Sequence, residues 1–365
     1  MDFRDIVLTC IPRMREDFVP LRALVGFDGF VDEINHVVRE RTSSREFSRI
    51  ETINEFAKRI AGAAGLSANL ELVPRQIKLG GNGPIMANAL VQLGVEVDYI
   101  GALGKPYCHP VFSQFCQAVR RTVSLSQPGF TDALEFRDGK LMLGKMASLA
   151  DINWEELTRT IEISEIGEMI KNSRLVVFTN WTMLPGLESI MAGFLELMRE
   201  SRYAPLVFFD LADPQKRTRE DIRNVLARIS DFAGATEVIL GMNKRESDII
   251  AGILAIEEEI LSHRAALLRK ELRIDNVVIH PVDGAAAADR EQQFWLPGPY
   301  TPEPVLTTGA GDNFNAGFCL GRITGMELLQ CLVLGVFTSG FYVRKGYSPH
   351  REELADFMEE WYDRY

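Results

Sequence analysis

Short apolar runs alternate with amphipathic stretches along most of this 365-residue chain. Alternation of strands with helices is typical of βαβ units and a parallel sheet. Several of the runs are apolar throughout, as expected for strands that helices cover on both faces. We therefore predict a doubly wound, three-layer α/β/α sandwich. The predicted strands are 23–28, 95–101, 174–180, 205–211, 236–241 and 276–281, and the predicted helices are 84–94, 153–171, 185–201, 216–231 and 243–272.

Two segments interrupt this alternation. Residues 131–146 form two alternating runs around Asp138-Gly139, which predicts a β-hairpin. Residues 29–79 are charged, with a helix expected over 49–64 and an extended piece over 69–79. Both segments could build a small β-rich lid over the sheet, or they could decorate its surface. No Pro/Gly/Ser-rich linker divides the chain, so we expect a single domain over 1–365.

The charge and the cysteines exclude several classes of protein. The net charge is −11 and no Lys/Arg stripe is present, which argues against a nucleic-acid-binding face. The five cysteines are scattered without a CxxC pair, as expected for free thiols in a reducing compartment. The N-terminus lacks the apolar core of a signal peptide, and the apolar run at 331–343 is too short to span a membrane. We expect a cytoplasmic protein.

The stretch TTGAGDNFNAG, residues 307–317, combines a flexible backbone with a predicted helix start. Gly309 and Gly311 allow positive φ angles and close approach to a ligand. Unpaired N–H groups from Ala310 to Asn313 would form an anion hole suited to a phosphoryl group. Asp312 would then act as the base that takes a proton from a hydroxyl between them. Alternatively, Asp312 is only a helix N-cap.

Two further motifs accompany this stretch. GGNGPIMANALVQLG, residues 80–94, precedes it by about 220 residues, and GMNKRE, residues 241–246, lies between them. Together they resemble the ribokinase/PfkB family of carbohydrate kinases over roughly residues 23–350. The resemblance implies a ribokinase-like fold with a lid, and ATP-dependent, Mg²⁺-dependent phosphorylation of an alcohol group on a sugar or sugar-like molecule.

By this resemblance Asp312 is the catalytic base, and the amides of Gly309, Ala310 and Gly311 form the anion hole. Asn243 and Glu246 would organise Mg²⁺ and the nucleotide phosphates through water, and Gly311 would also contact the nucleotide. The alternative for Asn243 and Glu246 is a helix cap with its capping-box partner.

The resemblance also places the acceptor. Gly80-Gly81 would be the hinge of the lid, and Asn82 would point toward the sugar; the alternative is a simple turn before a helix. Asp32 is the preferred ligand of the sugar hydroxyls, and Asp28 is the second candidate. Both acids are expected at the end of the first strand, where ligands bind in open α/β sheets. One of the two could instead cap a helix.

Three departures from the family pattern restrict what it implies. Thr307 replaces the usual Asp, which leaves activation by a monovalent cation open, and Ile85 replaces a common Asn that touches the substrate. Residues 280–289 copy the nucleotide-side loop poorly. A nucleoside kinase and a catalytically weak, metabolite-binding regulator therefore remain alternatives. Exposed lid strands could also pair two copies into a homodimer.

Overall fold

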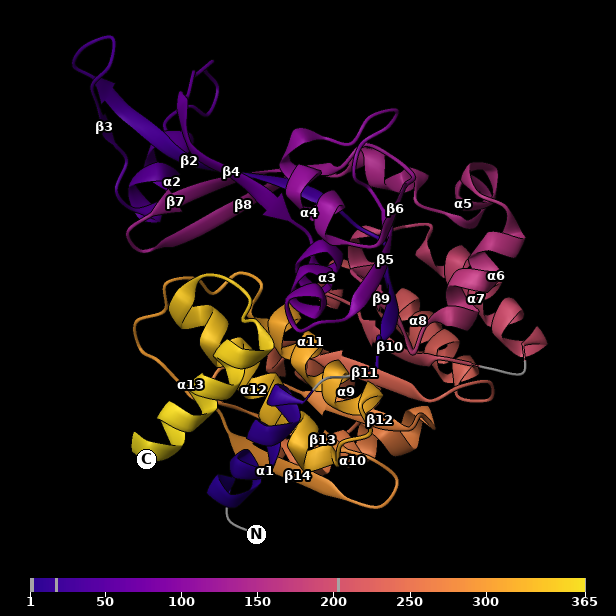
Figure 1. Cartoon of the computed structure of the whole chain (residues 1–365). Helices are drawn as coiled ribbons and strands as arrows, with labels where there is room; N and C mark the ends of the chain where they lie inside the picture. Colours follow the sequence, from indigo (N-terminus) through magenta and orange to yellow (C-terminus); the bar gives the residue numbers. More distant parts are fainter. Residues whose placement is uncertain (1–2, 17–18, 202–203, 365) are drawn as a thin grey trace.

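The computed structural model describes residues 3–16, 19–201 and 204–364. Its main sheet has nine strands in the order β14-β13-β12-β11-β10-β9-β1-β5-β6 (Figure 1). The strands from β6 to β12 are parallel, and β13 and β14 continue the sheet antiparallel. Their bounds are β1 (Arg22–Gly26), β5 (Glu96–Gly101), β6 (Arg121–Ser124), β9 (Leu175–Thr179), β10 (Leu206–Asp210), β11 (Val238–Met242), β12 (Asn276–Ile279), β13 (Gly284–Ala288) and β14 (Gln293–Pro297).

Helices cover both faces of this sheet, each over its own apolar core. One face carries α1 (Phe3–Arg15), α3 (Asn82–Gln92), α4 (Ser113–Ala118), α11 (Ala310–Ile323), α12 (Leu328–Lys345) and α13 (Arg351–Arg364). The other carries α5 (Trp154–Thr160), α6 (Ile163–Asn172), α7 (Leu187–Glu200), α8 (Arg219–Phe232), α9 (Lys244–Ile253) and α10 (Leu261–Leu272). The predicted three-layer sandwich is confirmed.

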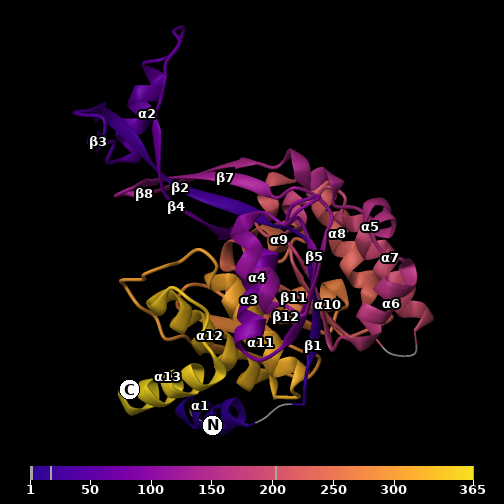
Figure 2. The ribbon, with the colours of Figure 1, turned by 45° about the horizontal axis from the view of Figure 1, so that its top comes forward.

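A second, five-stranded sheet projects from the body of the molecule (Figure 2). We call it the small sheet: β2 (Phe30–Arg41), β3 (Phe47–Arg49), β4 (Leu72–Gly80), β7 (Gly129–Phe136) and β8 (Gly139–Lys145). Helix α2 (Ile53–Ala61) packs on it through Phe56, whose ring lies 5.4 Å from that of Phe136. Both segments that interrupt the sequence pattern, 29–79 and 131–146, contribute to this sheet. The predicted hairpin around Asp138-Gly139 is present.

The structure corrects several predicted elements. The helix expected over 153–171 is two helices, because Ile161 is extended between α5 and α6. The helix expected over 243–272 ends at α9, where Ala255 has a positive φ of 57°, and resumes as α10. Asp32 lies within β2 rather than at the end of the first strand, because the chain returns directly into the small sheet after β1.

Two findings bear on the classes excluded above. None of the helices in the described part of the chain is long and apolar enough to cross a membrane. All five cysteines are free thiols, as the sequence predicted.

Candidate active site

The two glycine-rich stretches meet at the start of two neighbouring helices. Asn82 is the first residue of α3, and Asp312 lies in the first turn of α11. The Asn82 Nδ2 donates a hydrogen bond of 2.9 Å to Asp312 Oδ1, across 230 positions of sequence. The Asp312 side chain is only 5% exposed. The carboxylate and the amide therefore face the same point between the helices.

The turn before α11 has the conformation that the glycines were expected to allow. Gly309 has a φ of 94°, and a Cβ there would come within 2.8 Å of Tyr342 Oη. The N–H of Ala310, however, donates to the carbonyl of Thr307 at 3.1 Å. Among the described residues, the N–H groups of Gly309, Gly311 and Asp312 have no hydrogen-bond acceptor. These three amides, rather than that of Ala310, are free to bind an anion.

Four buried carboxylates surround this point: Asp28, Asp210, Glu246 and Asp312. Burial, and then the charge of Asp210, raise the pKa of Asp312 well above its usual range. Burial and the charge of Glu246 raise the pKa of Asp210 to about 8. In the described residues no Lys or Arg forms an ion pair with any of the four. The ligand-free cluster therefore holds protons, and a bound cation would favour its ionised form.

Of the two acids that could cap a helix, Asp28 is the one that does so. Its Oδ2 accepts from the Asn82 N–H at 3.0 Å, and its Oδ1 accepts from the Gly83 N–H at 2.8 Å. The Asn180 Nδ2 also donates to Oδ2 at 2.6 Å, and the Asp28 side chain is fully buried. Because the helix start and Asn180 bind this carboxylate, Asp28 holds α3 in place. Its role as a second sugar ligand stays a prediction.

Asn243 and Glu246 form the capping box that was the alternative for these residues. Asn243 Oδ1 accepts from the Glu246 N–H at 2.9 Å, and Glu246 Oε2 accepts from the Asn243 N–H at 2.8 Å. The other carboxylate oxygen, Oε1, accepts from the Asp213 N–H at 2.8 Å. Burial raises the pKa of Glu246. The box fixes the carboxylate near Asp210, so capping is compatible with a further role.

The residues fit a water-mediated metal ion better than a directly bound one. No group of three His, Cys, Asp or Glu side chains in the described ranges is arranged to hold a metal. Each oxygen of Glu246 already accepts one backbone N–H, and Asp210 accepts from the Ala212 N–H and from Asn315. Such oxygens can still accept a hydrogen bond from a metal-bound water. This is the arrangement expected for Mg²⁺, which keeps much of its hydration.

A cavity of about 310 Å³ lies on one side of the α11 start. Asn243, His280, Tyr300, Gly311 and Phe314 are among its lining residues. Burial lowers the pKa of His280 to about 4, so the ring is neutral, and its centroid lies 4.8 Å from that of Phe314. A Cβ at Gly311 would meet the His280 ring at 3.0 Å. The cavity therefore presents the rings of His280, Tyr300 and Phe314 and no charged lining residue, next to the free amides.

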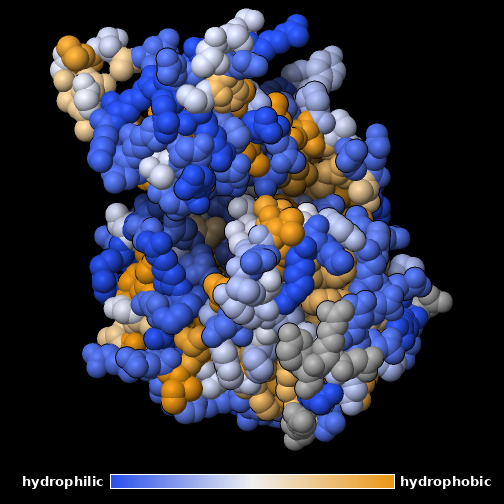
Figure 3. Space-filling model, turned by 90° about the vertical axis from the view of Figure 1, so that its left-hand side faces the viewer, coloured by the Kyte–Doolittle hydropathy of each residue, from blue (hydrophilic) through white to orange (hydrophobic). Residues whose placement is uncertain are grey.

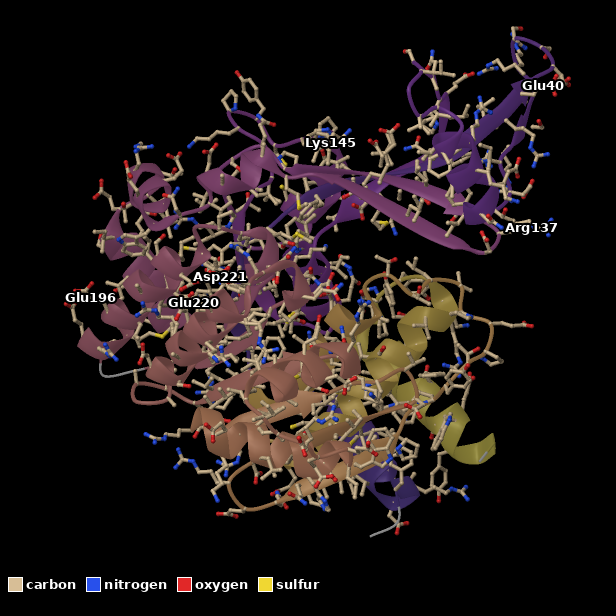
Figure 4. All side chains as sticks on the ribbon, turned by 180° about the vertical axis from the view of Figure 1, so that it is seen from behind. Glu40, Arg137, Lys145, Glu196, Glu220 and Asp221 are labelled. Carbon is tan, nitrogen blue, oxygen red and sulfur yellow. The ribbon has the colours of Figure 1, made fainter. Side chains whose placement is uncertain are left out.

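A larger cleft, of about 1540 Å³, lies on the other side, between the small sheet and the body. Figure 3 shows largely hydrophilic surface above and below the recess at this level. Four cationic side chains line the cleft, with a single acid, Glu135. The cations are Lys78, Arg137, Lys140 and Lys345. Figure 4 places Arg137 at the tip of the β7–β8 hairpin.

Asp32 is directed to the same side as the cleft. It pairs with Lys78 across β2 and β4, and paired residues of adjacent strands share one face of a sheet. Its carboxylate lies over Gly80, where a Cβ would come within 2.4 Å of Oδ2. Burial raises the pKa of Asp32, while Thr131 and Lys78 oppose that shift. Gly80 therefore provides the space that Asp32 occupies, and Gly81, with a φ of 100°, begins the turn into α3.

Sequence reasoning missed three polar residues of this centre: Asn180, Asp210 and Asn315. Asp210 and Asn180 follow the buried strands β10 and β9, and their position at the carboxyl ends of parallel strands was a usable signal. Asn315 lies one helical turn after Asp312 in the stretch already singled out, and it donates to Asp210 at 2.8 Å. Only the fold shows that these side chains contact the acid cluster.

Fold and site together define a carbohydrate kinase of the ribokinase-like, PfkB class. The structure of Arabidopsis thaliana ribokinase complexed with ribose and ATP superposes with a TM-score of 0.66 at 17% identity, covering 94% of this chain and 99% of that one. A family model described as prokaryotic ketohexokinase matches residues 2–361. The chain belongs to the prokaryotic ketohexokinase family.

Two curated relatives agree with this assignment. A ketohexokinase of Haloferax volcanii is 28% identical over 346 residues, which cover 94% of this chain and 92% of the relative. A 5-dehydro-2-deoxygluconokinase of Bacillus cereus is 24% identical over 302 residues, which cover 77% of this chain and 86% of the relative. The chain is a phosphotransferase of the sugar kinases.

Proposed function

We propose that this protein transfers the γ-phosphoryl group of ATP to a hydroxymethyl group of a ketohexose. The observation that carries the proposal is the buried Asp312 carboxylate, which lies in the same helical turn as the free N–H groups of Gly309 and Gly311. Free amides at a helix start suit a migrating phosphoryl group, and an adjacent carboxylate suits removal of a proton from the attacking hydroxyl. The curated ketohexokinase supports the choice of acceptor.

In this mechanism Asp312 Oδ2 takes the hydroxyl proton, while Asn82 holds Oδ1 in place. The amides of Gly309, Gly311 and Asp312 stabilise the charge that develops on the transferring group. Asp312 must be ionised to act as a base, yet its neighbours raise its pKa. Magnesium bound with the nucleotide would supply the positive charge that favours ionisation and would neutralise the donor phosphates. Glu246 and Asn243 would orient its water ligands.

The cavity beside His280 and the larger cleft would each bind one of the two substrates, the nucleotide and the sugar. The uncharged cavity beside His280 suits the base of the nucleotide, since a flat ring can contact His280 and Phe314. The cleft under the small sheet suits the sugar, with Asp32 accepting from vicinal hydroxyls. The small sheet would act as a lid hinged at Gly80-Gly81, which excludes water during transfer.

A homodimer through the small sheet is part of this proposal. The edge strands β4 and β8 carry exposed apolar side chains: Ile77 is 56% exposed, and Met142 and Leu143 are each 50% exposed. A second copy would cover these side chains and the open strand edges. Sedimentation or light scattering would measure the oligomeric state.

A sugar acid or sugar phosphate is a second candidate acceptor. The cleft holds four cations and one acid in a protein whose net charge is −11. This contrast favours an anionic group on the acceptor. The relative named 5-dehydro-2-deoxygluconokinase also supports an acidic sugar. No comparable observation favours a nucleoside acceptor or a purely regulatory protein.

The test is a kinase assay with a panel of ketohexoses, aldoses, sugar acids, sugar phosphates and nucleosides. We expect phosphorylation of a ketohexose that Asp312→Asn abolishes or greatly reduces. The control is Glu220→Gln, since Glu220 is an exposed acid on α8, remote from the site (Figure 4). Turnover of sugar acids alone would favour the second candidate. Turnover unaffected by Asp312→Asn, or none with any acceptor, would contradict the mechanism.

A further inference from the structure

Two cysteines that flank lining residues of the larger cleft are in contact. Cys108, in the loop after β5, and Cys116, in α4, place their Sγ atoms 3.1 Å apart. A disulfide has an S–S distance of ~2.0 Å, so closing this gap needs a shift of roughly 1 Å. The spacing of seven residues between them matches no recognised redox motif, and the sequence therefore gave no hint of the pair.

The two thiols differ in accessibility. Cys108 is exposed, whereas Cys116 is half-buried. Burial raises the pKa of Cys116 to about 12, and the hydrogen bond to Cys108 acts in the same direction. The other cysteines, Cys10, Cys319 and Cys331, are buried in the core. A dissolved oxidant therefore reaches Cys108 first, with Cys116 already within reach of its sulfur.

We propose that Cys108 and Cys116 are a reactive dithiol. They form a reversible disulfide with each other by exchange with low-molecular-weight disulfides such as oxidised glutathione. The Cys108 thiolate attacks one sulfur of oxidised glutathione, which breaks the glutathione S–S bond and releases one glutathione thiolate. The Cys116 thiol then gives its proton to a thiolate in solution and attacks the Cys108 sulfur, releasing the second glutathione. The two protein thiols lose two electrons, and one small disulfide is reduced to two thiols.

The disulfide would restrict the movement of residues 108–116, which form part of one wall of the larger cleft. Val111, Gln114 and Phe115 lie between the two cysteines and line that cleft. In the same segment, the His109 ring lies 5.9 Å from the ring of Phe130 on β7 of the small sheet. Fixing this segment restricts a wall that the small sheet contacts. We therefore expect oxidation to change the KM for the sugar and not the KM for ATP. This expectation rests on the proposed function.

The test treats the folded protein with oxidised glutathione, alkylates the remaining thiols, and measures intact and peptide masses. We expect the wild-type chain to lose two hydrogens, to link Cys108 to Cys116 and to recover both thiols under dithiothreitol. Cys116→Ser should retain one glutathione on Cys108, because no second thiol displaces it. Cys108→Ser should take up none while folded.

Three outcomes would overturn the proposal. The first is free thiols at both positions of the folded protein in a mixture that oxidises the unfolded protein. The second is a glutathione adduct that persists on the wild-type protein. The third is a disulfide from Cys108 or Cys116 to any other cysteine. The kinetic readout is separate. An unchanged sugar KM in a fully linked protein rejects the effect on the cleft, and absent kinase activity in both forms contradicts the proposed function, not the disulfide.

Discussion

Asp210 ends β10 inside the acid cluster, and its pKa of about 8 makes the stability of the protein dependent on pH. The folded protein holds a proton there that the unfolded chain releases at the ordinary aspartate pKa of 3.8. Stability is therefore fully present below pH 4 and is lost as the pH rises through the folded pKa. Asp210→Asn removes this dependence, because an amide does not titrate. Asn315 can turn its own amide and so keep the hydrogen bond to residue 210.

We expect the Tm of the ligand-free wild type to fall more between pH 5 and pH 8 than that of Asp210→Asn. The difference should reach several degrees, since each kcal/mol shifts the Tm of a large domain by about 2–4 °C. Thermal denaturation at several pH values measures it. Glu220→Gln is the control and should follow the wild type. Parallel curves for Asp210→Asn and the wild type would show that the carboxyl is ionised throughout this range.

Asp32 gives a second prediction for a single residue. Asp32→Asn should raise the sugar KM by about tenfold or more, because a hydrogen bond to a charged group is worth ~1.5–3 kcal/mol. The ATP KM should stay close to that of the wild type. The matched control is Asp132→Asn on β7, which removes an acid paired with Lys145 at 3.0 Å on the same small sheet. Equal effects of both variants would assign the loss to the sheet rather than to the sugar.

The sequence identified the residues whose chemistry is local. Asp312 and Asn82 each follow a glycine-rich stretch that signals a helix start, so both could be singled out. Asp32 was preferred over Asp28 as the sugar ligand, but which of the two caps a helix could not be predicted, because the return of the chain from β1 into β2 decides it. The interaction of Asp210 with the cluster depends on strand order, which no local pattern specifies.

At the level of elements, the start of α9 separates capping from ligand binding. Asn243→Ala should cost about 1 kcal/mol of stability, the usual loss of an N-cap side chain. It should also raise the ATP KM if Asn243 and Glu246 help to hold the donor. Thr218→Ala is the matched control, because Thr218 and Asp221 form a capping box at the start of α8. We expect a similar loss of stability from Thr218→Ala and no change in the ATP KM.

Kinetics and urea unfolding of the two cap variants measure these quantities. An ATP KM that is unchanged in Asn243→Ala, or that rises equally in both variants, would leave Asn243 with its structural role alone.

The elements differ in how well the sequence predicted them. The parallel strands β1, β5 and β9 to β12 were predicted within a few residues because both of their faces are buried and their composition is apolar. The parallel edge strand β6 was not predicted, since it is short and only partly buried. The long helices were predicted too long, because helical periodicity continues across the breaks at Ile161 and Ala255. Strand β2 was missed because buried polar residues, Asp32 and Asn35, interrupt its pattern.

At the scale of the whole molecule, α12 joins both ends of the described chain to the sandwich. Phe337 on α12 is fully buried, and its ring contacts those of Phe3 on α1 and Trp361 on α13. Phe337→Ala should lower the free energy of unfolding by about 3–5 kcal/mol through the cavity that it leaves. Turnover per folded molecule should be unchanged, because Phe337 lines neither the cavity beside His280 nor the larger cleft.

Urea unfolding and turnover at low temperature measure these two quantities. Phe337→Leu is the control, with a smaller loss of stability since it keeps most of the volume. A fall in turnover that matches the fall in stability would link the terminal helices to the site.

The sandwich itself followed from the alternation of strands and helices. The packing of α1 against α13 did not, because the sequence holds no local signal that brings together segments more than 300 residues apart. The same limit applied to the two cysteines and to the acid cluster, whose members become neighbours only in the folded chain.

The crowding of four carboxylates, with which no Lys or Arg in the described part of the chain forms an ion pair, also bears on calorimetry. If nucleotide and magnesium neutralise this cluster, saturation of the enzyme will expel hydrogen ions into the medium. The apparent heat of association would then vary with the ionisation enthalpy of the buffer, and donor affinity would weaken in acid. The ligand-free enzyme would thus hold protons on its carboxylates and release them when nucleotide and magnesium bind.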